Sequence, residues 1–115
     1  MSFRWPSKDP DETLDYSVDW SRFLESAVID SVKWFVQSNL YNTKTEIQAG
    51  QTLTTASSNA TTDSVQNVSQ TNTNTVATIN IAGGQNNVEY TFSCQMTDDT
   101  GSTAERTIKL RMKER

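Results

Sequence analysis

Few side chains in this sequence could carry out chemistry. The chain has no histidine, which removes the commonest general base and the commonest transition-metal ligand. Without histidine, a Cys–His nucleophile is excluded. Cys94 is the single cysteine, so a cysteine-rich zinc site and an intrachain disulfide are excluded as well. Gly83 and Gly84 lack the spacing and the following helix of a phosphate-binding loop. We therefore expect a protein that is not an enzyme and that needs no cofactor.

Carboxylates are the remaining chemical candidates. Asp9, Asp11 and Glu12 lie close together, and Asp15 and Asp19 follow them. Such a group could bind calcium, which takes several carboxylate and carbonyl oxygens. The spacing lacks the glycine and the terminal glutamate of a calcium-binding loop. We therefore prefer solvated or turn-capping carboxylates and no metal, with calcium as the alternative.

Aromatic side chains are the main indication of a function. Phe3, Trp5, Phe35 and Tyr41 are not accounted for by the apolar pattern of the expected strands, and Arg4 lies between the first two. Aromatic residues left outside a core are typical anchors of protein interfaces. These five residues are therefore our candidates for docking a partner. The alternative is a small second cluster packed beneath the N-terminal segment.

The elements that would position these residues are strands. Apolar and polar residues alternate strictly at 14–20, again at 76–81, and over a hairpin at 88–112 with its turn at 98–101. Residues 29–38 read as another strand, and Trp20 and Trp34 are the natural large core residues. Between the first two strands we expect a single helical turn capped by Asp19 and Ser21. The pattern predicts an all-β fold, an antiparallel two-sheet sandwich.

Two segments depart from this pattern. Residues 1–12 read as an extended N-terminal arm, because Pro6 and Pro10 disfavour helix before them and no apolar period is present. The arm either lies back on its own domain, the sandwich at 13–115, or docks on a partner. Residues 57–75 are a polar Thr- and Asn-rich stretch, either a long loop or an edge hairpin completed by another chain.

Charge and hydropathy exclude further classes of partner. The net charge of −4 argues against nucleic acid, whose binding proteins carry basic patches. No apolar run approaches the roughly 20 residues of a membrane span, and residues 1–6 lack the apolar stretch of a signal peptide. We expect a chain that is synthesised in a cytoplasm and that binds neither nucleic acid nor a membrane.

Two regions resemble a known family. The motifs near the start are Lys8-Asp9-Pro10-Asp11, Leu14-Asp15-Tyr16 and Asp19-Trp20-Ser21, and the distinctive segments near the end are residues 88–92 and 101–108. These segments are similar to the opening and the end of small phage proteins known as fiber-tail adaptors. The resemblance covers about forty residues and leaves the polar middle of the chain outside it.

The resemblance implies a specific role. It implies an immunoglobulin-like sandwich in the tail of a bacteriophage virion. We expect several copies there, made in the host cytoplasm. Its partners would be the tail hub or nozzle proteins and the tail fiber protein. Asp15 and Asp19 would be structural members of the motif, with the segment Phe3–Trp5 as the first docking candidate and residues 57–75 as the second. The alternatives are a carbohydrate- or host-surface-binding sandwich and a capsid decoration protein.

Overall fold

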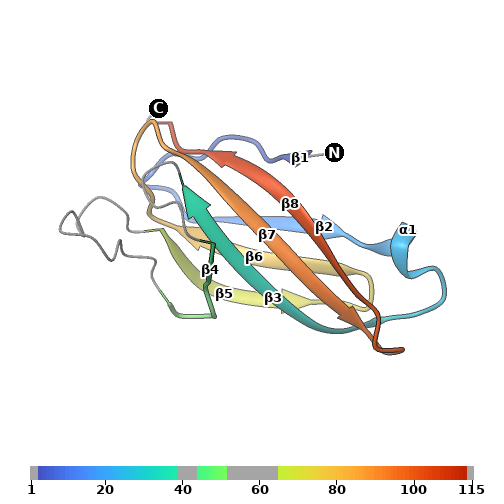
Figure 1. Cartoon of the computed structure of the whole chain (residues 1–115). Coiled ribbons are helices and arrows are strands. Elements are labelled where there is room, and N and C mark those ends of the chain that lie inside the picture. Colours follow the sequence, from blue (N-terminus) through green and yellow to red (C-terminus); the bar gives the residue numbers. More distant parts are fainter. Residues whose placement is uncertain (1–2, 39–43, 52–64, 114–115) are drawn as a thin grey trace.

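The computed structural model describes residues 3–38, 44–51 and 65–113. Within this part, eight strands form two sheets packed face to face, and one short helix follows β2 (Figure 1). The elements in chain order are β1 (Phe3–Arg4), β2 (Leu14–Asp19), α1 (Ser21–Leu24), β3 (Ile29–Ser38), β4 (Thr45–Glu46), β5 (Gln66–Asn72), β6 (Val76–Ala82), β7 (Glu89–Asp98) and β8 (Thr103–Arg111).

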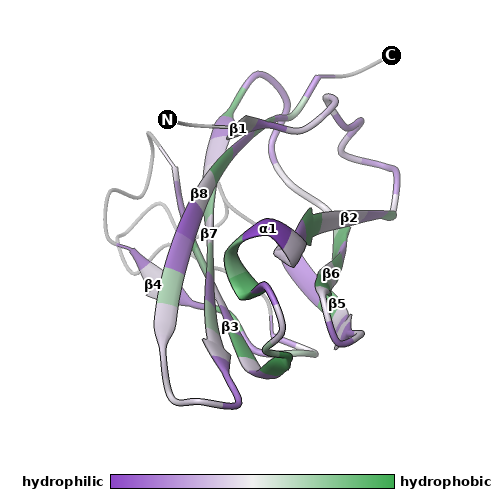
Figure 2. Cartoon of the chain, turned by 90° about the vertical axis from the view of Figure 1, so that its right-hand side faces the viewer, coloured by the Kyte–Doolittle hydropathy of each residue, from purple (hydrophilic) through white to green (hydrophobic). Residues whose placement is uncertain are grey.

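The two sheets differ in size. The larger has the strand order β1-β8-β7-β3-β4, and the smaller has the order β2-β6-β5. All neighbouring strands are antiparallel except β1, which runs parallel to β8. Figure 2 shows the two sheets side by side with α1 between them at the near end. The predicted all-β, antiparallel two-sheet sandwich is confirmed.

The alternating sequence places one face of each strand in the core. In β2, Tyr16 and Val18 are buried while Asp15, Ser17 and Asp19 are exposed. The β7–β8 hairpin runs from the pair Glu89–Arg111 to the pair Thr97–Thr103 with no register shift. These elements lie where the period of two predicts them.

The turn between β7 and β8 is stabilised by one carboxylate. Asp98 accepts hydrogen bonds from the Thr100 amide at 2.9 Å, the Thr100 hydroxyl at 2.6 Å and the Ser102 amide at 3.0 Å. These bonds, the Thr100 hydroxyl first, hold the pKa of Asp98 below its ordinary value. Gly101 has a φ of 93°, a conformation that favours glycine. The turn chemistry expected at 98–101 is present.

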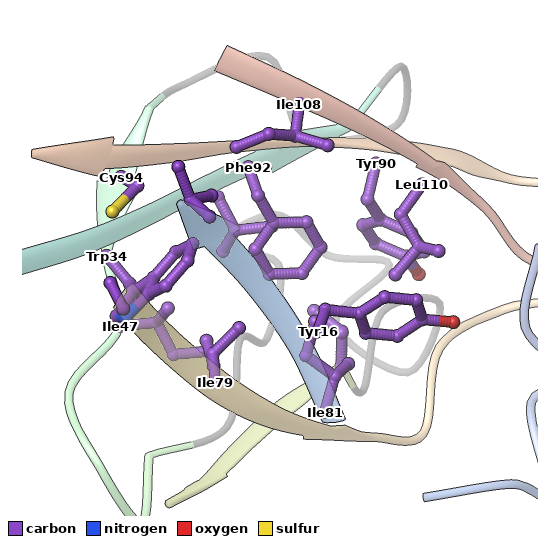
Figure 3. Packing of buried hydrophobic residues seen from close by; sticks show 14 of the residues in the cluster. Tyr16, Trp34, Ile47, Ile79, Ile81, Tyr90, Phe92, Cys94, Ile108 and Leu110 are labelled. Atoms are coloured by element: carbon purple, nitrogen blue, oxygen red, sulfur yellow. The ribbon is translucent and has the colours of Figure 1, made fainter. Parts of the chain in front are cut away.

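The core lies between the sheets and includes both predicted tryptophans. Trp20 and Trp34 are 2% and 1% exposed. Figure 3 shows the rings of Tyr16, Trp34 and Phe92 within the buried cluster. Cys94 lies opposite Trp34 on the neighbouring strand, and burial raises the pKa of its thiol to about 12. The cysteine therefore behaves as a small apolar core residue.

Amide side chains connect the two sheets on the side where β3 and β5 lie. The buried Asn67 donates from Nδ2 to the Ile47 carbonyl at 3.0 Å and to Gln70 Oε1 at 2.9 Å. Gln70 in turn donates to the Val32 carbonyl at 3.2 Å. In the polar stretch 57–75, residues 66–72 form β5 at the edge of the smaller sheet. Residues 57–64 of this stretch lie outside the described part.

Candidate interaction surfaces

The N-terminal segment lies along its own domain. β1 pairs in parallel with β8, with Phe3 opposite Ile108 and Arg4 opposite Lys109. Further along, the Trp5 amide donates to the Lys109 carbonyl at 2.9 Å. Of the two arrangements that the sequence left open for the arm, its described residues adopt the first, in which the arm packs on the sandwich. The side chain of Phe3 lies outside the described part.

Trp5 packs between the two sheets on the side where β8 and β2 lie, away from Asn67 on β5. Its ring stacks on Tyr16 with the centroids 4.7 Å apart, and it lies 5.7 Å from the Phe92 ring and 6.0 Å from the Trp34 ring. Its Nε1 donates to the Ser17 carbonyl at 3.2 Å. Trp5 therefore belongs to an aromatic cluster beneath the arm, which was the alternative interpretation of this residue. Docking through its exposed part stays a prediction.

A pocket of about 280 Å³ opens beside Trp5, between the edges of β8 and β2. Its lining residues are Arg4, Trp5, Ser17, Val18, Asp19, Arg106 and Ile108. The Arg4 guanidinium pairs with Glu89 at 2.7 Å on the rim, and its side chain is 58% exposed. The Arg106 guanidinium lies 4.7 Å from the Trp20 ring centroid and donates to the Asp19 carbonyl at 3.2 Å. The lining thus combines apolar residues with charged and polar ones, as the contact surfaces of proteins do.

Phe35 lies on a different surface. It projects from β3 to the outer face of the larger sheet, where it is half-buried. The Lys44 ammonium lies 5.0 Å from the centroid of its ring and forms an ion pair with Glu105 at 2.6 Å. The structure therefore separates Phe35 from Arg4 and Trp5. Tyr41 lies outside the described residues, so the predicted docking set is not brought together in one patch.

The carboxylates of Asp9, within the Lys-Asp-Pro-Asp motif, and of Glu12, just after it, stabilise a turn between the arm and β2. Asp9 Oδ1 accepts from the Asp11 amide at 2.8 Å, and Glu12 Oε1 accepts from the Asp9 amide at 2.9 Å. The Glu12 amide donates back to the Asp9 carbonyl at 2.9 Å. These side chains therefore satisfy backbone donors of the turn, as Asp side chains commonly do.

Lys8, the first residue of that motif, is fully buried. Its ammonium donates to the Gly83 carbonyl at 2.7 Å and to the Asp9 carbonyl at 2.9 Å. Burial lowers the pKa of Lys8, and the charges of Glu12, Asp9 and Asp11 oppose this shift. Lys8 thus ties the arm to the end of β6, on the side of the molecule where the acidic turn lies.

The other acidic residues have local structural partners. Asp15 accepts a hydrogen bond from the Asn80 side chain, across the β2–β6 pair. Asp19 Oδ1 accepts from the Ser21 amide at 2.9 Å, which holds the pKa of Asp19 below its ordinary value. The expected helical turn is present at α1, but its N-cap is Trp20, which makes no side-chain capping bond, and not Asp19 or Ser21. The described residues contain no cluster of three or more His, Cys, Asp or Glu that could hold a metal ion. Nor is any helix among them long and apolar enough to cross a membrane.

Two important residues were not found from the sequence. Arg106 occupies an inward position on β8, between Ala104 and Ile108, and the period of two could have identified it. Lys8 lies in a segment with no apolar period, so no pattern indicated its burial.

A family model described as podophage GP4 fiber-tail adaptor protein gp77 matches residues 8–46 and 40–111. The chain belongs to this family. No curated protein matches it. The match to the fiber-tail adaptor family begins at Lys8 and ends at Arg111, so it includes the motif turn and the strands β2 to β8. The family name denotes a structural role in the phage tail, and the resemblance found in the sequence is confirmed.

Proposed function

We propose that this adaptor joins the tail fibers to the tail hub of a podophage virion through protein–protein contacts. The family match over residues 8–111 carries this proposal. Several copies would act together in the assembled tail, after synthesis in the host cytoplasm. The acidic net charge of −4 and the absence of histidine agree with a role in binding proteins and not in catalysis or nucleic-acid binding.

The strand order supports an immunoglobulin-like assignment of the fold. In such domains strands B, E and D share one sheet and strands G, F and C the other. Here β2-β6-β5 and β8-β7-β3 repeat that order, with β4 beside β3. Tyr90, near the start of β7, accepts a hydrogen bond on its hydroxyl from the Gln85 amide at 2.9 Å. A tyrosine bonded to the backbone a few residues upstream is a feature of the same fold.

One docking surface of the adaptor would include Arg4 and Trp5 beside the pocket. A second would lie elsewhere, because an adaptor has to hold two partners at once. Phe35 and Tyr41 stay candidates for it, together with residues 57–75. Arg4→Ala tests the first surface without disturbing the core, since the Arg4 side chain is 58% exposed. We expect weaker binding to one partner, tail or fiber, and unchanged binding to the other.

Quantitative mass spectrometry of virions tests the function itself. Heads and tails are separated, and the copy number of the chain is measured against the fiber and hub proteins in each fraction. We expect the chain in the tail fraction at a fixed small copy number. Recovery with the heads would indicate a decoration protein instead, and absence from both fractions would refute the structural role.

A further inference from the structure

The outer faces of the two sheets differ in charge. Side chains alternate along a strand, so each sheet turns one face to the core and the other outward. In the smaller sheet, the strands β2, β5 and β6 contain two charged residues, Asp15 and Asp19, and no base. Both side chains are exposed on the outer side of β2, so the two carboxylates give this face a charge of −2. We call it the acidic face.

The outer face of the larger sheet is basic. Phe35 marks this face, and the strand pairing places Ser93 of β7 and Thr107 of β8 in the same row. Every second residue from these positions points the same way. The charged side chains described on this face are the bases Arg4, Lys33, Lys44, Lys109 and Arg111 and the acids Glu46, Glu89 and Glu105. Five bases and three acids give a net charge of +2, in a chain whose total is −4. We call it the basic face.

Ion pairs within the basic face leave two of its bases over. The three pairs are Arg4–Glu89 at 2.7 Å, Lys109–Glu89 at 3.9 Å and Lys44–Glu105 at 2.6 Å. Lys33 and Arg111 are exposed and form no ion pair with any other residue of the described part. The positive charge of this face is therefore available to a negatively charged surface of a partner.

The uncharged side chains of both sheets also suit a protein contact. Around its two acids, the acidic face carries hydroxyl and amide side chains, among them those of Ser17, Thr78 and Asn80. Val68 of β5 is a 42% exposed apolar side chain of the same sheet. Phe35 is half-buried on the basic face. Apolar side chains surrounded by polar ones are the usual composition of a protein interface.

We propose that the basic face of one copy binds the acidic face of a second copy of this chain. Charge selects this occupant, because the surface that complements the basic face is present on the same protein. Since the two faces differ, the contact is head-to-tail, and each copy keeps one face free for the next copy. Such contacts continue from copy to copy and can close into a ring. The inference goes beyond the proposed function, because it states how copies of the adaptor contact one another.

The size of the acidic face sets the conditions of the test. Its strands have six or seven residues and lie about 4.8 Å apart, so the face spans roughly 24 Å by 15 Å. This is less than the roughly 800 Å² per partner of a standard interface, so a single contact should be weak. Analytical ultracentrifugation therefore measures self-association up to about 1 mM protein, in about 0.05 M and about 0.5 M NaCl. We expect dimers and larger species that the higher salt dissociates, and a chain that stays monomeric in the lower salt would overturn the proposal.

Charge reversal tests each face by itself. Lys33→Glu combined with Arg111→Glu turns the net charge of the basic face from +2 to −2, and Asp15→Lys turns that of the acidic face from −2 to zero. We expect each variant to weaken self-association at least tenfold, because like charges then meet or the attraction is lost. Asp15→Asn keeps an acceptor for Asn80 and should weaken it less, in the same direction.

Mixing the two variants tests the head-to-tail geometry. The double variant keeps its acidic face, and Asp15→Lys keeps its basic face, so one unmodified contact can form between them. We expect the labelled double variant to bind Asp15→Lys within about threefold of the affinity of the unmodified pair. A contact between two like faces would leave one variant associating normally, and mixing would restore nothing. That result, or association that survives both variants, would overturn the proposal.

The matched controls lie at α1, at one end of the sandwich and outside both faces. Arg22→Glu and Glu25→Lys make the same changes of charge there and should associate as the unmodified chain does. Urea denaturation checks that each variant is folded. A monomeric chain that is still recovered in the tail fraction would overturn this inference and leave the proposed function standing. A chain that self-associates as expected but is absent from virions would refute the proposed function and support the head-to-tail contact.

Discussion

The ring of Trp5 stacks on that of Tyr16 with 4.7 Å between the centroids and an interplanar angle of 25°. Trp5 follows β1 at the edge of the larger sheet, and Tyr16 belongs to β2 in the smaller one. The stacked pair therefore connects the edges of the two sheets through side chains. A residue of the arm in this way packs against the hydrophobic core.

We expect Trp5→Ala to destabilise the domain. The substitution removes the stack on Tyr16, the contacts with Trp34 and Phe92, and the bond to the Ser17 carbonyl. The loss should be about 2 kcal/mol, below the usual range for a fully buried tryptophan because Trp5 is half-buried. Urea denaturation measures it. Phe23→Ala on α1 is the control, since Phe23 is 37% exposed, and an equally small effect of both substitutions would show that the arm does not support the core.

Lys8 should contribute to stability through its stem and its ammonium. Lys8→Ala leaves a cavity and removes the ammonium bonds to the Gly83 and Asp9 carbonyls, and it should cost about 3 kcal/mol. Lys8→Met keeps most of the buried volume and should cost about half as much. Equal losses in urea denaturation would show that the ammonium bonds dominate and that the stem does not matter.

Lys8 should make the free energy of unfolding rise with pH in the alkaline range. Burial lowers its pKa below the ordinary value of 10.5, so just below that pH the unfolded chain binds more protons than the folded one. The free energy of unfolding of the unmodified chain should therefore rise relative to that of Lys8→Met as the pH approaches 10.5. A fall over the same interval would contradict the lowered pKa.

Gly84→Ala should be much more costly than Gly101→Ala. Both glycines have positive φ, 106° and 93°. A Cβ on Gly84 would lie 2.7 Å from the Met112 side chain, which is fully buried, whereas a Cβ on Gly101 meets nothing within 4 Å. We expect losses of about 3 and about 1 kcal/mol respectively in thermal or urea unfolding. Similar losses at the two positions would mean that Met112 moves aside without cost.

Asp98 should make the β7–β8 turn sensitive to acid. Hydrogen bonds from Thr100 and Ser102 lower its pKa below the ordinary 3.8, so its contribution is present above that pH and is lost as the pH falls through the lowered value. Asp98→Asn should therefore destabilise the domain at pH 7 and much less at about pH 2. Unfolding free energies at both values test this, with Asp30→Asn, at an exposed position of β3, as the control for loss of one negative charge. An equal effect at both values would contradict the assignment.

The sandwich could be predicted because its strands alternate cleanly. In β7 the apolar positions Tyr90, Phe92, Cys94 and Met96 all face the core, as a period of two requires. The helical turn after β2 was also predictable, since Asp19 and Ser21 have the chemistry of a turn. These signals are local, and each is read from fewer than ten residues.

The positions of Trp5 and Lys8 could not be predicted in the same way. Trp5 has no periodic neighbours, and its place between the sheets depends on β8, which lies about a hundred residues away in the sequence. The buried ammonium of Lys8 bonds to the carbonyl of Gly83, which is 75 positions away in the sequence. Contacts between distant segments leave no pattern in the sequence, so the packing of Trp5 against the core could not be predicted, and its role in docking stays a prediction.

The parallel pairing of β1 with β8 has a mechanical consequence. A force that pulls on the chain before β1 and after β8 acts along both strands in opposite directions. The bonds Trp5 N–H to Lys109, Lys8 N–H to Arg111 and Lys113 N–H to Lys8 then bear the load together in shear, instead of opening one after another as in an unzipping hairpin. Resistance to tension depends on the rate of forced unfolding and not on equilibrium stability. A few hydrogen bonds in this arrangement can therefore keep the domain folded when its two ends are drawn apart.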